Sequence, residues 1–244
     1  MQYIWLLWNS ILDHQLAYLM GDILFGIVWL TLFILRKDLR REMWVMSAIG
    51  AILSPLALVY LPDYWYPEHI TGPFMLGIED FLFAFFIAGI GAVLYEVVTN
   101  RVHTLCECRR VPKKRIIGII IMSVLVLLAS LYGFKLNSIY ANYLAFGFLF
   151  AYIIYFRRDL LWQSLVSGFM VALLMFIFYQ VWITIYPGII EHWWKLSNIS
   201  GVLIFGVPFE EIIWGASWGM AGGSIYEYVR GIGTYSMSSK RLKN

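Results

Sequence analysis

Seven long runs of apolar residues, separated by short polar or charged segments, cover most of the chain. They occupy roughly residues 15–35, 43–61, 74–98, 116–134, 139–156, 163–186 and 201–229. Each run is close to the ~20 residues that an α-helix needs to cross the hydrocarbon core of a bilayer. The pattern therefore predicts an all-α, polytopic membrane protein with about seven transmembrane helices.

The composition agrees with this prediction. Of the 244 residues, 61% are hydrophobic and 14% are charged, whereas soluble domains carry about 25% charged residues. A single soluble core of this size could not bury so much apolar surface. No signal peptide with a cleavage site is visible, so we expect the whole sequence in the mature protein.

Basic residues are confined to alternate loops. Of the 18 lysines and arginines, all but Lys135 and Lys195 follow the first, third, fifth or seventh apolar run. Because positive residues stay on the cytoplasmic side, the amino end is predicted outside the cell membrane and the carboxyl end in the cytoplasm. The net charge of +3 is then a signal of topology, and we expect no nucleic-acid partner.

The chain also contains an internal repeat. The segment LGIEDFLFAFFIAGIGAVLYEVV (76–98) aligns without a gap on VPFEEIIWGASWGMAGGSIYEYV (207–229) at a shift of 131 residues, and LRKDL (35–39) resembles FRRDL (156–160) at a shift of 121. The alignment predicts two parallel three-helix repeats, residues 1–115 and 137–244, joined by a linking helix at 116–136. A binding site commonly lies between such repeats.

An acidic pair occurs at the same place in both repeats, as Glu79-Asp80 and Glu210-Glu211. Ionisable residues inside a membrane are costly and are interpreted as functional by default. The alternative is that each pair lies in the first turn of a helix, where the macrodipole favours acids, with Pro208 as the first helical residue. This alternative leaves the recurrence of two adjacent acids without an explanation.

Small residues follow the acids at helical spacing. The rows are Asp80, Ala84, Ala88, Ala92 and Glu96, and Glu211, Gly215, Gly219, Gly223 and Glu227. Small residues four apart allow helix backbones to approach closely, so we expect these rows in helix contacts and Asp80 and Glu211 in one shared cavity. Glu96 and Glu227 are interpreted as interface anchors or as partners of nearby arginines.

Other polar residues leave alternatives open. Asp22 either joins the acidic cluster or caps an outer helix end. The spacing of His14, His69 and His192 is not a recognised metal pattern, and the pair Cys106 and Cys108 has no further ligands nearby in sequence, so we expect no metal. No glycine-rich nucleotide fingerprint occurs, and we expect no cofactor.

The two acidic segments, GIEDFLFAFFIAGIGAVLYE and GVPFEEIIWGASWGMAGGSIYE, resemble the lycopene cyclase domain of heterodimer-type or fused carotenoid cyclases. That family carries a P-x-E-(E/D) motif in each of two membrane units. Pro208, Glu210 and Glu211 match the motif, and Glu79 and Asp80 match its acidic positions, with Gly77 in place of the proline. The resemblance implies that these four acids are catalytic, and Phe83, Phe86, Trp214 and Trp218 are candidates for substrate binding.

The activity implied is the non-redox cyclisation of a linear, lycopene-type polyene by carboxylate acid–base catalysis. The partners would be a lipid-soluble polyene or isoprenoid and the bilayer, and the sequence leaves room for a homo-oligomer. Two alternatives remain open: a small proton-coupled transporter, since paired intramembrane carboxylates also suit proton movement, and an inactive, cyclase-like carotenoid-binding protein. A retinal-linked photoreceptor is excluded because residues 201–229 contain no lysine.

Overall fold

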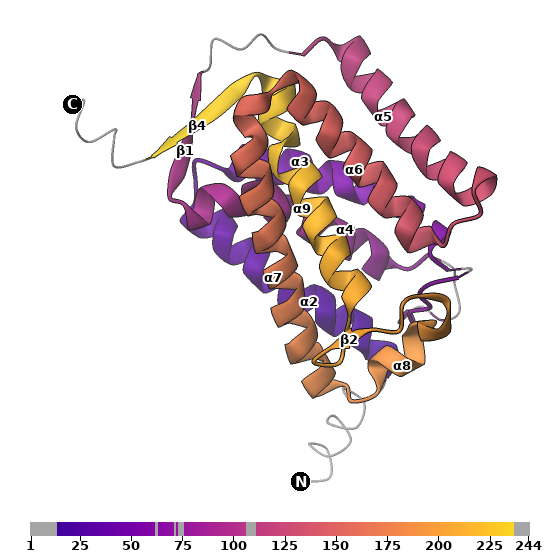
Figure 1. The fold of residues 1–244 in the computed structure, drawn as a ribbon. Coiled ribbons are helices and arrows are strands. Elements are labelled where there is room, and N and C mark those ends of the chain that lie inside the picture. The colour runs from indigo at the N-terminus through magenta and orange to yellow at the C-terminus, as the bar shows by residue number, and fades with distance from the viewer. Residues whose placement is uncertain (1–13, 62, 71, 73–75, 106–110, 237–244) are drawn as a thin grey trace.

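The computed structural model describes residues 14–61, 63–70, 72, 76–105 and 111–236, so Cys106 and Cys108 lie outside the described residues. Long helices form most of the described structure (Figure 1). They are α2 (His14–Leu35), α3 (Arg40–Leu53), α4 (Ile78–Val98), α5 (Lys113–Leu128), α6 (Ser138–Phe156), α7 (Leu161–Ile185) and α9 (Phe209–Arg230). The short helix α8 (Ile189–Trp193), the 3-10 turns η1 (Ser54–Val59), η3 (Arg158–Leu160) and η4 (Leu196–Asn198), and the π-helical turn η2 (Ala129–Gly133) complete the helical part.

Six helices among the described residues are long and apolar enough to cross a membrane, and the chain is an all-α integral membrane protein. They are α2, α3 with η1, α4, α5 with η2, α6, and α7 with η3. Helix α9 is as long but falls outside this set, because acidic residues and glycines make it less apolar. It packs against α4, α6 and α7, and neighbouring helices therefore cover much of its surface.

Two predicted spans begin later than the apolar runs suggest. Helix α4 begins at Ile78 and α9 at Phe209, whereas the runs begin at 74 and 201. The strands β2 (Leu203–Ile204) and β3 (Val207–Pro208) form a hairpin immediately before α9. Pro208 is extended, with ψ of 129°, so the chain cannot turn helical until the following residue.

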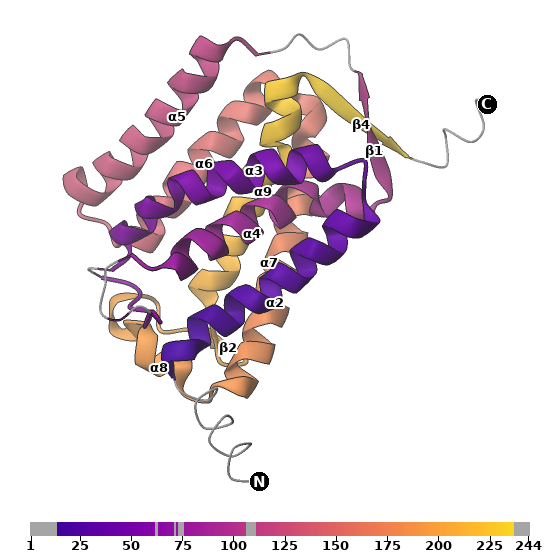
Figure 2. The same ribbon diagram turned by 180° about the vertical axis from the view of Figure 1, so that it is seen from behind.

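The helices fall into two groups with the same packing pattern. In the first group, α2 and α3 pack against α4, and in the second group, α6 and α7 pack against α9. Helix α4 meets α9 between the groups, and α5 packs against α6 (Figures 1 and 2). This arrangement agrees with the predicted repeat. The superposition of the two groups and the proposed domain boundaries stay predictions.

Two arginines make equivalent contacts in the two groups. Arg36 Nη1 donates to the carbonyl oxygen of Glu96 at 2.8 Å, and its Nη2 donates to that of Arg101. Arg157 Nη1 donates to the carbonyl oxygen of Glu227 at 3.4 Å, and its Nη2 donates to that of Ile232 at 2.9 Å. These residues are related by the same shifts of 121 and 131 that align the sequence. Each arginine thus links the loop after the first helix of its group to the end of the third helix of that group.

Backbone pairing joins the two groups at both ends of the bundle. The strand β1 (Arg101–Leu105) pairs with β4 (Ile232–Ser236) in antiparallel register, with His103 opposite Thr234. The ends of the helices that carry most of the described basic residues gather near these strands (Figure 1). At the other end, Trp65 forms an isolated bridge with Trp194.

The row of glycines on α9 packs closely against α7. A Cβ atom on Gly219 would lie 2.7 Å from the carbonyl oxygen of Ser167 and 2.8 Å from Cα of Gly168. In the first group, a Cβ atom on Gly50 of α3 would lie 2.3 Å from the carbonyl oxygen of Ala84 on α4. Each row of small residues therefore faces the second helix of its own group, and α4 and α9 meet beside these contacts.

Candidate active site

A cavity of about 250 Å³ lies between the two helix groups, next to the acidic pairs. Both groups contribute to its lining, which is mostly apolar and aromatic. Aromatic members include Tyr60, Phe83, Phe146, Phe178, Trp214 and Trp218. Three carboxyl groups also line it: Asp22 of α2, Asp80 of α4 and Glu211 of α9. The predicted shared cavity therefore contains one member of each acidic pair and a third acid from α2.

Glu211 is held by donors from the loops before α4 and α9. Its Oε1 accepts hydrogen bonds from the Tyr64 hydroxyl and, at 2.9 Å, from Nε1 of Trp194. Burial raises the pKa of Tyr64 well above its usual range, and the nearby Glu211 raises it further, so the phenol stays protonated and donates. These donors suit the carboxylate form of Glu211, because each hydrogen bond stabilises negative charge on the accepting oxygen.

Asp80 is held in a similar way by donors from several segments. Its Oδ1 accepts from the Tyr18 hydroxyl at 3.1 Å, and its Oδ2 lies 2.9 Å from Nε2 of His69. The backbone N–H of Gly77 donates to Oδ2 at 2.7 Å, which is the reciprocal bond of a helix capping box. Asp80 thus caps α4 and at the same time presents its carboxylate to the cavity.

Asp22 differs from the other two acids. Its side chain is 1% exposed, and neither carboxyl oxygen has a hydrogen-bond partner among the described residues. It borders both the central cavity and a second groove, of about 300 Å³, that Leu19, Gly26, Leu82 and Phe86 help to line. Of the two roles open from the sequence, the structure supports membership of the acidic cluster. Its position in an apolar helix, LMGDILFG, was the signal for it.

The other member of each acidic pair turns toward the loop that precedes its helix. Glu79 Oε1 accepts from the backbone N–H of Ile70 at 2.7 Å. Glu210 Oε1 accepts from the backbone N–H of Ser200 at 2.9 Å and from the hydroxyl of Tyr140 at 3.1 Å. Neither residue is part of the cavity lining. As the macrodipole alternative expects, both acidic pairs lie in the first turn of a helix, α4 or α9. All four acids are nevertheless buried.

Three of the four aromatic candidates line the cavity. The rings of Phe83 and Trp214 lie 6.0 Å apart, and those of Phe146 and Trp218 lie 5.5 Å apart. Nε1 of Trp214 donates to the Tyr60 hydroxyl at 3.2 Å, which fixes the indole in the wall. The fourth candidate, Phe86, lines the second groove.

Glu96 and Glu227 lie outside this site, and their surroundings differ from those predicted. Both are fully buried, with 0% exposure, and neither makes an ion pair with an arginine among the described residues. Glu96 instead accepts a hydrogen bond from Gln163, and Glu227 faces His103. Among the described residues, Glu42, His103 and Glu227 form a group that could hold a metal ion.

Residues 137–229 match the family model described as lycopene cyclase. This segment is similar to lycopene cyclases. No curated protein and no solved structure matches the chain.

The matched segment spans α6, α7 and most of α9. It therefore includes Glu210, Glu211, Trp214 and Trp218, and the resemblance seen in the sequence is confirmed for this part of the chain. The first group, with Glu79 and Asp80, lies outside the matched range. Its relation to the lycopene cyclase family rests on the internal repeat and on the contacts that both groups share.

Proposed function

We propose that the protein is a carotenoid cyclase that closes a ring at one end of a linear, lycopene-type polyene. The observation that carries the proposal is the central cavity, in which three buried carboxyl groups face an aromatic and aliphatic lining. Its volume is near that of the smaller ligand pockets, roughly 300 Å³. It suits one end group of a polyene, with the rest of the hydrocarbon left in contact with lipid.

The reaction is an isomerisation that needs no oxidant or reductant. A carboxylic acid donates a proton to the terminal double bond, and a tertiary carbocation forms. The electron pair of an internal double bond then closes the ring and moves the positive charge onto a ring carbon. A carboxylate removes an adjacent proton, which restores the double bond. Proton uptake and release balance, and the product has the same atoms as the substrate.

We assign the acid role to Asp22 and the charge-stabilising and base roles to Asp80 and Glu211. Asp22 has no described donor to stabilise a negative charge, and burial of a lone carboxylate is costly, so it suits the protonated form. Asp80 and Glu211 each accept several hydrogen bonds, which suits anions. Two environments for similar carboxyl groups are a known way to divide acid and base roles.

The aromatic lining has two functions in this proposal. The faces of Phe83, Trp214 and Trp218 can stabilise a passing carbocation, because the ring quadrupole attracts positive charge. The same side chains exclude water, which would otherwise capture the carbocation as an alcohol.

Expression in a host that accumulates lycopene, followed by pigment analysis, tests the proposal. The wild-type protein is expected to produce cyclic carotene. Asp22→Asn removes the proton donor without changing shape, and positioned acid–base groups contribute ~10²–10⁴-fold, so product should fall by that order. Glu68→Gln is the matched control, because Glu68 is only partly buried and pairs only with His192 among the described residues.

Absence of cyclic product from wild-type protein that is folded and inserted in the membrane would overturn the proposal. Proton movement by the same protein in vesicles would then favour the transporter, and carotenoid retention without conversion would favour a binding protein.

A further inference from the structure

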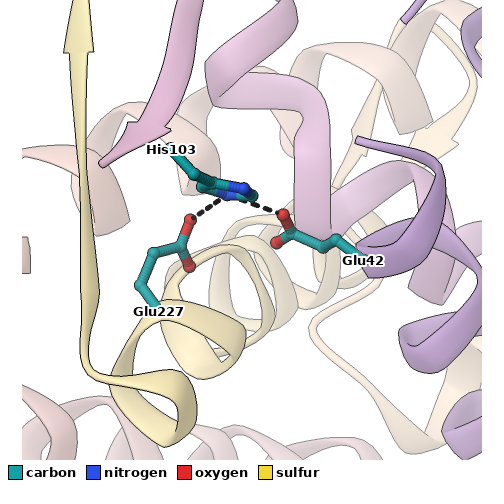
Figure 3. A group of neighbouring side chains, drawn as sticks. All are labelled: Glu42, His103 and Glu227. Atoms are coloured by element: carbon teal, nitrogen blue, oxygen red, sulfur yellow. Dashed lines mark ion pairs between the residues drawn. The ribbon is translucent and has the colours of Figure 1, made fainter. Parts of the chain in front are cut away.

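Three side chains from distant parts of the chain meet near the paired strands β1 and β4 (Figure 3). Glu42 comes from the first turn of α3, His103 from β1 and Glu227 from the end of α9. Nε2 of His103 lies 2.9 Å from a carboxyl oxygen of Glu42 and 3.4 Å from one of Glu227. The three ligand atoms lie within 4.8 Å of one another.

The two carboxyl groups in this cluster form ion pairs with His103 but accept no well-directed hydrogen bond from the described residues. Glu42 is 1% exposed and Glu227 is 0% exposed, and no oxygen of either side chain has a hydrogen-bond donor among the described residues. Nε2 of His103 faces both carboxyl groups but makes a well-directed hydrogen bond to neither. Two carboxylates cannot satisfy each other because both only accept. A shared positive charge stabilises a buried pair of carboxylates, and either His103, which forms ion pairs with both, or a bound metal ion can supply it.

The positions related to this cluster by the internal repeat show a different arrangement. Gln163 stands 121 residues after Glu42, and Glu96 stands 131 residues before Glu227. Nε2 of Gln163 donates to Oε1 of Glu96 at 3.1 Å, so the amide supplies the donor that Glu42 lacks. Thr234 stands opposite His103 in the strand register. Glu42 and His103 of the first half thus meet Glu227 of the second half, whereas at the repeat-related place Gln163 of the second half donates to Glu96 of the first.

We propose that Glu42, His103 and Glu227 bind a divalent first-row transition-metal ion. One imidazole nitrogen and two carboxylate oxygens suit Zn²⁺ or Mn²⁺, whereas Ca²⁺ and Mg²⁺ prefer oxygen ligands alone. The His103 side chain is 21% exposed, which gives an ion a route from the aqueous side. The ion joins α3 and α9 through β1 and thereby fastens the two helix groups together, away from the cavity.

Zinc binding to the purified full-length protein in detergent tests the proposal. After treatment with a chelator, the protein is titrated with Zn²⁺, and bound metal and thermal unfolding are measured. Wild-type protein should bind an equimolar amount of zinc and unfold at a higher temperature with zinc than without it. Because Cys106 and Cys108 are thiols that can also bind zinc, the same titration is repeated with both changed to serine.

Two further variants separate the metal site from general effects on folding. His103→Gln should lose the bound zinc and the shift in unfolding temperature. His192→Gln should keep both, since His192 is exposed and its described partner is Glu68. Glu42→Gln reproduces the Gln163–Glu96 arrangement, so it should fold, bind no zinc and unfold at a temperature that the chelator does not change. Equal zinc binding by wild type and His103→Gln, or no zinc-dependent shift in wild type, would overturn the proposal.

Discussion

At the scale of single residues, neighbouring acids of the same kind have different surroundings. Glu211 faces the cavity and accepts from Tyr64 and Trp194, whereas Glu210 holds the loop at Ser200. In α4, Asp80 likewise faces the cavity, whereas Glu79 accepts a hydrogen bond from the loop at Ile70. Successive helix positions differ by about 100°, so one acid in each pair can serve the site while the other orders the loop that closes it.

The same isosteric change in both neighbours should therefore have unequal effects. Glu211→Gln removes the negative charge and the base from the cavity, and we expect cyclic product to fall by ~10²–10⁴-fold. In Glu210→Gln, the amide oxygen still accepts from Ser200, so the loss should be far smaller. Pigment yield per amount of folded protein measures both. Equal losses would show that the two acids act together in the chemistry.

At the scale of elements, the contact of α9 with α7 depends on the absence of side chains. The backbone of α7 lies so close to Gly219 that even a methyl group has no room. Membrane helices gain little from the hydrophobic effect on association, so close packing of this kind supplies much of the attraction between them. The position of Glu211, on the same helix as Gly219, therefore depends on this contact.

Gly219→Ala should destabilise the protein, because overpacking typically costs ~1–3 kcal/mol. Gly118→Ala in α5 is the matched control, since a Cβ atom there would have no atom within 4 Å. In a helix, this control change is neutral or stabilising by up to ~1 kcal/mol. Thermal unfolding in detergent compares the two variants, and equal unfolding temperatures would mean that α9 and α7 are not tightly packed.

At the scale of the whole molecule, the two ends of the bundle differ in charge and chemistry. The end with β1 and β4 carries most of the described basic residues and the cluster of Glu42, His103 and Glu227. The end with the Trp65–Trp194 bridge carries the loops that hold Asp80 and Glu211. By the positive-inside rule, the first end is predicted in the cytoplasm.

Labelling of cysteines tests this orientation. Cys106 and Cys108 are the two cysteines of the chain and precede the basic sequence RRVPKKR (109–115). A membrane-impermeant maleimide should label them only after the cells are opened. Lys135→Cys, in a chain with both native cysteines changed to serine, should instead be labelled in intact cells. The reverse pattern would place the amino end in the cytoplasm.

The sequence by itself determined the membrane fold, the acidic pairs and three of the aromatic residues of the cavity. Apolar runs report local partitioning into a bilayer, and of the about seven spans that they predicted, six are helices long and apolar enough to cross it among the described residues. The seventh, α9, is a long helix but is less apolar. The recurrence of Glu79-Asp80 and Glu210-Glu211 was visible because a repeat compares the chain with itself.

The tertiary structure alone decided which acids share the cavity and where the helices that carry them begin. The β2–β3 hairpin delays the start of α9, and pairing across the chain is not visible in a run of apolar residues. Asp22 is part of the site because α2 packs against α4. Glu42, His103 and Glu227 meet because β1 pairs with β4. Helical periodicity predicts which face of a helix a side chain lies on. Which residues that side chain contacts depends on packing between segments far apart in the sequence.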